Sequence, residues 1–191
     1  MIILRDDPSS DKIAFFELGM QYYIAGRASY LSFLMPVSGN LFHRAIEMML
    51  KAGLIGKYPP KDLWKVYGHK LPIMWQDFKE LFPQEKLARF DSFVNKLNGW
   101  EDLRYPRKTG SDVAILFALE KGKQPKIQKV VGRESKDYML ILEESDEFFK
   151  CVMKPLDVNP DYAKQYILTG FDERLNNYKK FNKHSVLESD L

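Results

Sequence analysis

The sequence predicts an all-α protein, an up-and-down antiparallel bundle of about six helices with a small insertion near residues 110–140. Apolar residues recur at spacings of three, four and seven along most of the chain, which is typical of amphipathic helices. Prolines and glycines separate these runs by short connections, and short connections make consecutive helices antiparallel neighbours. Between about residues 110 and 140 the helical spacing gives way to two short apolar runs, which predicts the insertion.

The first two helices are predicted over residues 11–34 and 41–54. Arg27 falls on the apolar stripe of the first helix, which includes Tyr23 and Tyr30. Pro36 is expected to stop this helix, because its ring removes a backbone hydrogen bond and crowds the preceding turn. Residues 38–40 then offer a cap for the second helix.

The later helices follow the same apolar spacing and are bounded by proline or glycine. A short helix is predicted first, and four longer ones follow it. Their expected ranges are 61–66, 71–82, 84–98, 142–154 and 159–181.

Net positive charge is concentrated in the region of the insertion. Residues 104–136 hold nine basic and three acidic side chains, a net charge of +6, whereas the whole chain has +3. The apolar runs 113–119 and 127–131 form either a small β-hairpin or an irregular loop. Residues 138–142 add a third strand or begin the next helix. The lysines either follow a phosphate backbone by charge or keep a solvated loop soluble.

Length and composition are those of a single globular domain over residues 1–191. Hydrophobic residues make up 45% and charged residues 29%, which disfavours disordered and collagen-like classes. The one cysteine, Cys151, cannot form an internal disulfide or a cysteine-based zinc site by itself. No apolar run approaches the ~20 residues needed to cross a bilayer. We therefore expect a cytoplasmic protein with no membrane association, no metal and no cofactor.

Four polar residues on or near the helical stripes are candidates for a role beyond packing. A buried Arg27 needs an acidic partner, and Glu47 on the neighbouring helix is the first candidate; phosphate contact and an extended, solvated side chain are alternatives. His43 and Glu47 can hydrogen-bond or hold a ligand jointly, or they form a solvated pair. His69 is either a general base or a residue that orients the start of the next helix.

Three short motifs, in this order and spacing, resemble those of HEPN domains, the "higher eukaryotes and prokaryotes nucleotide-binding" family. The first is HRAIEMMLKAGL, residues 43–54. The second is YGHKL, residues 67–71, which resembles the family's Gly-His-x-Leu element. The third is LRYP, residues 103–106. The match covers roughly residues 11–110.

The resemblance implies a helical bundle, often a homodimer, that binds a nucleotide or RNA. It also implies a possible nucleotidyltransferase partner and a defence or toxin–antitoxin setting. The ligand-binding groove would then be lined by Arg27, His43, Arg44, Glu47 and His69, with positive charge added by Arg104 and Arg107.

Some HEPN proteins are metal-independent ribonucleases, and these use an arginine, four to six intervening residues and then a histidine. No arginine stands at that spacing before any of the three histidines, His43, His69 and His184. The sequence therefore favours a binding module without catalytic residues. Two alternatives remain, a divergent ribonuclease that uses His69 or His43 with Arg44 or Arg104, and a dimeric structural scaffold.

Overall fold

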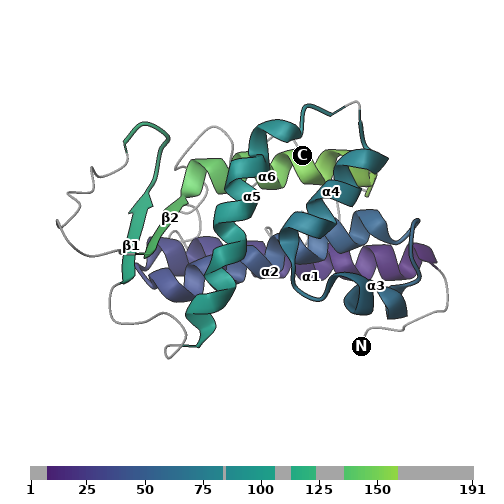
Figure 1. Ribbon diagram of the computed structural model, residues 1–191, viewed down its shortest axis with the longest axis horizontal. Coiled ribbons are helices and arrows are strands. Elements are labelled where there is room, and N and C mark those ends of the chain that lie inside the picture. The colour runs from purple at the N-terminus through teal and green to yellow at the C-terminus, as the bar shows by residue number, and fades with distance from the viewer. Residues whose placement is uncertain (1–7, 84, 106–112, 124–135, 159–191) are drawn as a thin grey trace, which may run out of the picture.

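The computed structural model describes residues 8–83, 85–105, 113–123 and 136–158 (Figure 1). The described part is mostly helical, which confirms the all-α class with a small insertion. Its α-helices are α1 (Pro8–Leu31), α2 (Met35–Leu54), α3 (Pro60–Tyr67), α4 (Leu71–Leu81), α5 (Asp91–Asn98) and α6 (Leu142–Met153). The strands are β1 (Val113–Ala118) and β2 (Lys136–Ile141), and the 3-10 turns are η1 (Ala88–Phe90), η2 (Gly99–Arg104) and η4 (Lys154–Leu156).

Helices α1 and α2 form an antiparallel pair along the long axis of the molecule (Figure 1). Two glycines of α1 allow the close approach. A Cβ at Gly19 would lie 3.2 Å from the carbonyl oxygen of Ala45, and a Cβ at Gly26 would lie 3.4 Å from the ring of Phe42. The small residues therefore bring the backbones of the two helices together, and this places the polar face of α2 on the side away from α1.

The connection between α1 and α2 is shorter than predicted. The amides of Phe33 and Leu34 donate to the carbonyls of Tyr30 and Ser29, which is the pattern of a Schellman motif. Phe33 holds the left-handed position, with φ of 60°. Helix α2 already begins at Met35, so Pro36 lies in the first turn of a helix instead of ending one. Proline is tolerated there because the first turn does not use its backbone nitrogen as a hydrogen-bond donor. The cap expected at residues 38–40 is not formed.

Aromatic rings join α6 to the other helices. Phe148 contacts Trp75 of α4, Phe90 of η1 and Phe93 of α5, with centroid distances of 5.0, 5.2 and 5.1 Å. The next residue of α6, Phe149, points to a different side of the helix and stacks on Tyr23 of α1 at 4.0 Å. The core is therefore continuous from α1 through α6 to α4 and α5.

The two strands of the insertion pair in parallel, with Val113 opposite Lys136 and Ala118 opposite Ile141. The partner of β1 is therefore the segment that was expected to add a third strand or begin the next helix; the second run of the predicted hairpin, 127–131, lies outside the described residues. The hydroxyl of Tyr30 lies 2.7 Å from the carbonyl oxygen of Ala118 and 3.3 Å from that of Leu140. This hydroxyl ties both strands to the end of α1.

Two other predicted helices differ from the structure or lie beyond it. The helix expected over residues 84–98 is replaced by η1 and the shorter α5. The helix expected over residues 159–181 lies outside the described residues. Among the helices that the structure describes, none combines the length and the apolar character needed to span a bilayer.

Candidate functional site

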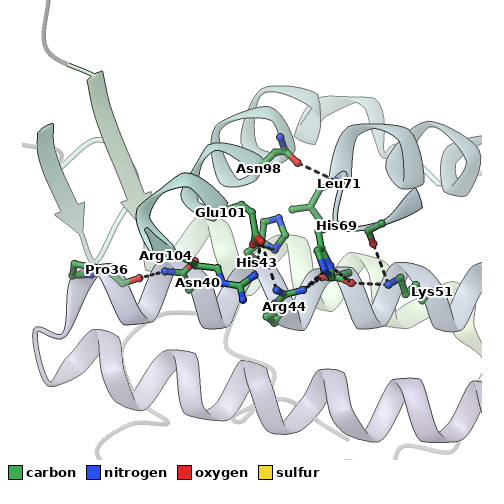
Figure 2. Close-up of polar contacts among 12 residues, drawn as sticks. Pro36, Asn40, His43, Arg44, Lys51, His69, Leu71, Asn98, Glu101 and Arg104 are labelled. Carbon is green, nitrogen blue, oxygen red and sulfur yellow. Dashed lines mark hydrogen bonds and ion pairs between the residues drawn. The ribbon is translucent and has the colours of Figure 1, made fainter. Parts of the chain in front are cut away.

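A polar cluster lies where α2 faces η2 and the turn between α3 and α4 (Figure 2). Helical spacing places its α2 members on one face: His43, Arg44, Glu47 and Lys51. The turn adds His69, and η2 adds Glu101 and Arg104. We call these seven residues the α2 polar cluster.

Glycines position the two segments that meet α2. Gly68, with φ of +56°, ends α3 and turns the chain so that His69 meets Glu47. Gly39 lies beneath the indole of Trp100, where a Cβ would come within 1.9 Å of the ring. The missing side chain at position 39 therefore lets η2 pack directly on α2.

Glu47 is the centre of the α2 polar cluster. Its side chain is 1% exposed, and its two oxygens accept hydrogen bonds from Lys51 Nζ at 2.6 Å and from Arg44 Nη1 at 2.7 Å. Burial by itself would raise the pKa of Glu47, but the hydrogen bond and charge of Lys51, helped by His69 and Arg44, bring that pKa below its ordinary value. Glu47 is therefore a buried, ionised carboxylate that holds three side chains in place.

His69 contacts the cluster through a single nitrogen. Its Nδ1 lies 2.7 Å from Arg44 Nη1 and 3.0 Å from Glu47 Oε1. The side chain is 53% exposed, so the ring is held by the buried residues while part of it faces solvent. This is the arrangement of an imidazole oriented by a carboxylate, which can bind an anion or exchange a proton.

His43 neither hydrogen-bonds to Glu47 nor forms a solvated pair with it, two of the arrangements that the sequence left open. It is completely buried, and within the described residues neither ring nitrogen has a hydrogen-bond partner. The nearest acidic atom to its Nδ1 is Glu101 Oε2, at 3.8 Å. Burial, only partly opposed by the charges of Glu101 and Glu47, lowers the pKa of His43 to about 4. His43 is therefore neutral at physiological pH and packs beneath the other members of the cluster.

The outer edge of the cluster is made of cations and one acid. Arg104 Nη1 lies 2.5 Å from Glu101 Oε1, and Arg44 Nη2 lies 3.6 Å from the same oxygen. The side chains of Arg44 and Arg104 are 19% and 35% exposed. Both guanidinium groups are thus partly exposed beside Glu101, and that of Arg44 also contacts the ring of His69.

Arg27 is not part of this cluster. It is buried, and it forms an ion pair with Asp146 of α6, whose other oxygen accepts a hydrogen bond from the Tyr23 hydroxyl at 2.6 Å. The predicted Arg27–Glu47 pair is therefore wrong. The stripe of α1 that carries Arg27 faces α6, whereas Glu47 faces the α3–α4 turn. The other predicted site residue, Arg107, lies outside the described residues.

Sequence reasoning missed two members of the α2 polar cluster, Lys51 and Glu101, and also Asp146, the partner of Arg27. Lys51 stands four residues after Glu47 on the same helix, a spacing that predicts a pair. Asp146 falls between Leu142 and Phe149 on the apolar stripe of α6, a signal equal to that of Arg27. Glu101 gave no signal, because its place depends on the packing of η2.

Within the described residues, no group of three or more histidine, cysteine or acidic side chains is arranged to hold a metal ion. Comparison of the chain with protein-family models, with curated proteins and with solved structures gave no match.

Proposed function

We propose that this protein is a non-catalytic binding module of HEPN type, which binds the phosphate groups of a nucleotide or RNA at the α2 polar cluster. The observation that carries the proposal is that Arg44 joins His69 to the Glu101–Arg104 pair along one partly exposed edge (Figure 2). Buried Glu47 holds Arg44 and His69 in place. Guanidinium groups match the geometry of phosphate oxygens.

The charge balance of the cluster supports an anionic ligand. Arg44, Lys51 and Arg104 are basic, and Glu47 and Glu101 are acidic. The cluster is therefore net positive even with both histidines neutral. Arg104 and His69, at 35% and 53% exposed, are more accessible than Glu101 at 26% and than buried Glu47, so the most exposed members of the cluster are not acidic.

Binding of a labelled single-stranded RNA, followed by fluorescence anisotropy over a series of salt concentrations, tests the proposal. We expect Arg44→Ala and Arg104→Ala each to weaken binding and to reduce the slope of log affinity against log salt by about one, because each arginine neutralises one phosphate. Lys154→Ala is the matched control, since Lys154 is 72% exposed and pairs with Glu85 outside the cluster. Equal effects of all three substitutions would contradict a localised site.

A second candidate function is metal-independent RNA cleavage, and the 3.0 Å contact between His69 Nδ1 and Glu47 Oε1 favours it. A carboxylate that orients an imidazole is a common device of general acid–base catalysis. Incubation of labelled RNA with the protein in the presence of EDTA separates the two functions. Cleavage that is lost in both His69→Ala and Glu47→Gln would establish catalysis, and cleavage that survives both would point to a contaminant.

The resemblance to HEPN domains also supports association with another chain, either a second copy or a nucleotidyltransferase partner in a defence or toxin–antitoxin setting. A dimeric scaffold without a nucleic-acid ligand is the competing proposal. Mass measurement by light scattering, combined with the RNA titration at low salt, distinguishes these: a dimer that binds no RNA at low salt is a scaffold, and one that binds RNA is not.

A further inference from the structure

The nitrogen Nδ1 of His69 has two neighbours with opposite hydrogen-bonding requirements. Arg44 Nη1, at 2.7 Å, can only donate a hydrogen bond, and Glu47 Oε1, at 3.0 Å, when ionised can only accept one. One nitrogen cannot be acceptor and donor at once. Each protonation state of the ring therefore favours one of these neighbours and repels the other.

The neutral ring with its proton on Nε2 suits Arg44. Nδ1 then presents a lone pair to the guanidinium, and Arg44 Nη1 bridges His69 and Glu47 Oε2. Glu47 Oε1 faces that lone pair, but it still accepts a hydrogen bond from Lys51 Nζ at 2.6 Å. In this state the guanidinium of Arg44 is held inward by two acceptors.

The protonated ring suits Glu47. Its Nδ1–H donates to the ionised carboxylate in a charge-assisted hydrogen bond, which is stronger than a neutral one. The same proton now points at a guanidinium nitrogen that was 2.7 Å away, so Arg44 loses one acceptor and faces a like charge. The cluster also gains one positive charge at its exposed edge.

We propose that His69 is a proton-operated latch on Arg44, and that binding of a phosphate group at this edge is accompanied by uptake of one proton. In the neutral state His69 retains Arg44, and in the protonated state it releases the guanidinium toward the ligand. The inference rests on the proposed phosphate-binding function of the same cluster, and it adds to that function a control by pH.

Charged groups on the elements around His69 could compete with a phosphate for Arg44. On α2 these are Arg44, Glu47 and Lys51, with His43 buried beneath them. On η2, Glu101 is the other acceptor near Arg44, at 3.6 Å, but it is already paired with Arg104. An incoming phosphate is therefore the group that best satisfies a released Arg44.

Binding of an RNA without terminal phosphates tests the latch, because its phosphodiesters do not titrate near neutrality. The probe is a single-stranded oligonucleotide of about ten residues with a rhodamine label, measured at constant ionic strength between about pH 8 and pH 6, the range in which histidine changes charge. We expect affinity to rise by about tenfold as the pH falls, within the usual range for two coupled equilibria. Calorimetry in two buffers with different ionisation enthalpies should show proton uptake.

His69→Gln is the decisive variant, because glutamine keeps a polar side chain that does not titrate. Its RNA affinity should not change with pH. Lys154→Ala is the control, and it should keep the wild-type pH dependence, since Lys154 is exposed and pairs with Glu85 outside the α2 polar cluster. An unchanged pH dependence in His69→Gln would overturn the inference.

Nitrogen-15 spectra of the ring test the latch without any ligand. At about pH 8 the inference requires an unprotonated Nδ1 and a proton on Nε2; a proton on Nδ1 at that pH would overturn it. A protein that binds no RNA at any pH would refute the proposed function and the ligand half of the inference. In that event the ring spectra still decide whether the latch itself exists.

Discussion

The carboxylate of Asp146 is the partner that makes a buried arginine tolerable in this core. Arg27 and Asp146 are 1% and 0% exposed, and Tyr23 adds a hydrogen bond from its hydroxyl. Removing one partner of such a pair leaves the other as an uncompensated buried charge. The cost then comes mainly from the charge that remains rather than from the contact that is lost.

We expect Asp146→Ala to lower the free energy of unfolding by about 3–5 kcal/mol, because Arg27 is left without its carboxylate. Urea denaturation of the purified variant measures this loss. Glu85→Ala is the control, since Glu85 pairs at 3.0 Å with the exposed Lys154 and should cost less than about 1 kcal/mol. Similar losses in both variants would show that burial of the pair does not determine its contribution.

The burial of His43 predicts a loss of stability in acid. The pKa of His43 is about 4 in the folded protein, below the ordinary value of 6.5, so the unfolded chain binds a proton in this interval that the folded protein does not. Stability is therefore complete above about pH 6.5 and falls as the pH drops toward 4. Between pH 7 and pH 5 the loss should be about 2 kcal/mol.

Urea denaturation at the two pH values measures this loss, and His43→Gln provides the comparison. Glutamine does not titrate, so the variant should lose less stability than the wild type over the same interval, whatever its stability at pH 7. A wild-type slope in the variant would assign the acid sensitivity to other groups.

At the scale of elements, the position of η2 on α2 depends on the lack of a side chain at Gly39. Trp100 packs over Gly39 so closely that a Cβ there would lie 1.9 Å from its ring. Gly39→Ala should therefore displace η2 and lower the free energy of unfolding by about 1–3 kcal/mol, the usual cost of overpacking. It should also weaken RNA binding, because η2 carries Arg104.

Thermal denaturation and the anisotropy titration measure the two effects. Gly56→Ala is the control, since a Cβ at Gly56 meets nothing within 4 Å. If Gly39→Ala and Gly56→Ala behaved alike, the contact with Trp100 would not be what positions η2.

The end of α1 is a second element that can be tested. Phe33 occupies the left-handed position of the Schellman motif, with φ of 60° and 70% of the residue exposed, although glycine is preferred there. Phe33→Gly should raise the free energy of unfolding by about 0.5–1 kcal/mol, because the backbone strain outweighs one exposed contact with Phe117. A fall in melting temperature would show instead that the Phe33–Phe117 contact dominates.

At the scale of the whole molecule, the shared aromatic core predicts cooperative unfolding. Phe148 contacts residues of α4, η1 and α5, and Phe149 stacks on α1. No helix in this set can unfold without exposing aromatic rings that pack against the other helices. Urea transitions followed by tryptophan fluorescence and by far-UV circular dichroism should therefore coincide. Two separate midpoints would mean that parts of the core unfold independently.

Local features of the sequence predicted most helices of this molecule but not its long-range contacts. Apolar spacing and flanking glycines or prolines predicted α3, α4 and α6 within one or two residues. The partner of Arg27 could not be predicted in the same way, because Asp146 lies 119 residues further along the chain. The parallel pairing of β1 and β2 also depends on distant segments, and nothing in either strand specifies its direction.

The candidate site was predicted where its residues share one helix. His43, Arg44 and Glu47 follow from the spacing of α2, and His69 was named from its motif. What the sequence did not reveal is which of the two histidines is buried. That depends on the packing of Trp100 and η2 over α2, which is a property of the folded chain.

The hydroxyl of Tyr30 gives the strands a fixed relation to the helices. A single oxygen at the end of α1 touches a carbonyl of each strand, at 2.7 and 3.3 Å. A displacement of either strand would therefore disturb its contact with the end of α1. The two strands are consequently fixed to the helical pair, and Tyr30→Phe would remove this contact.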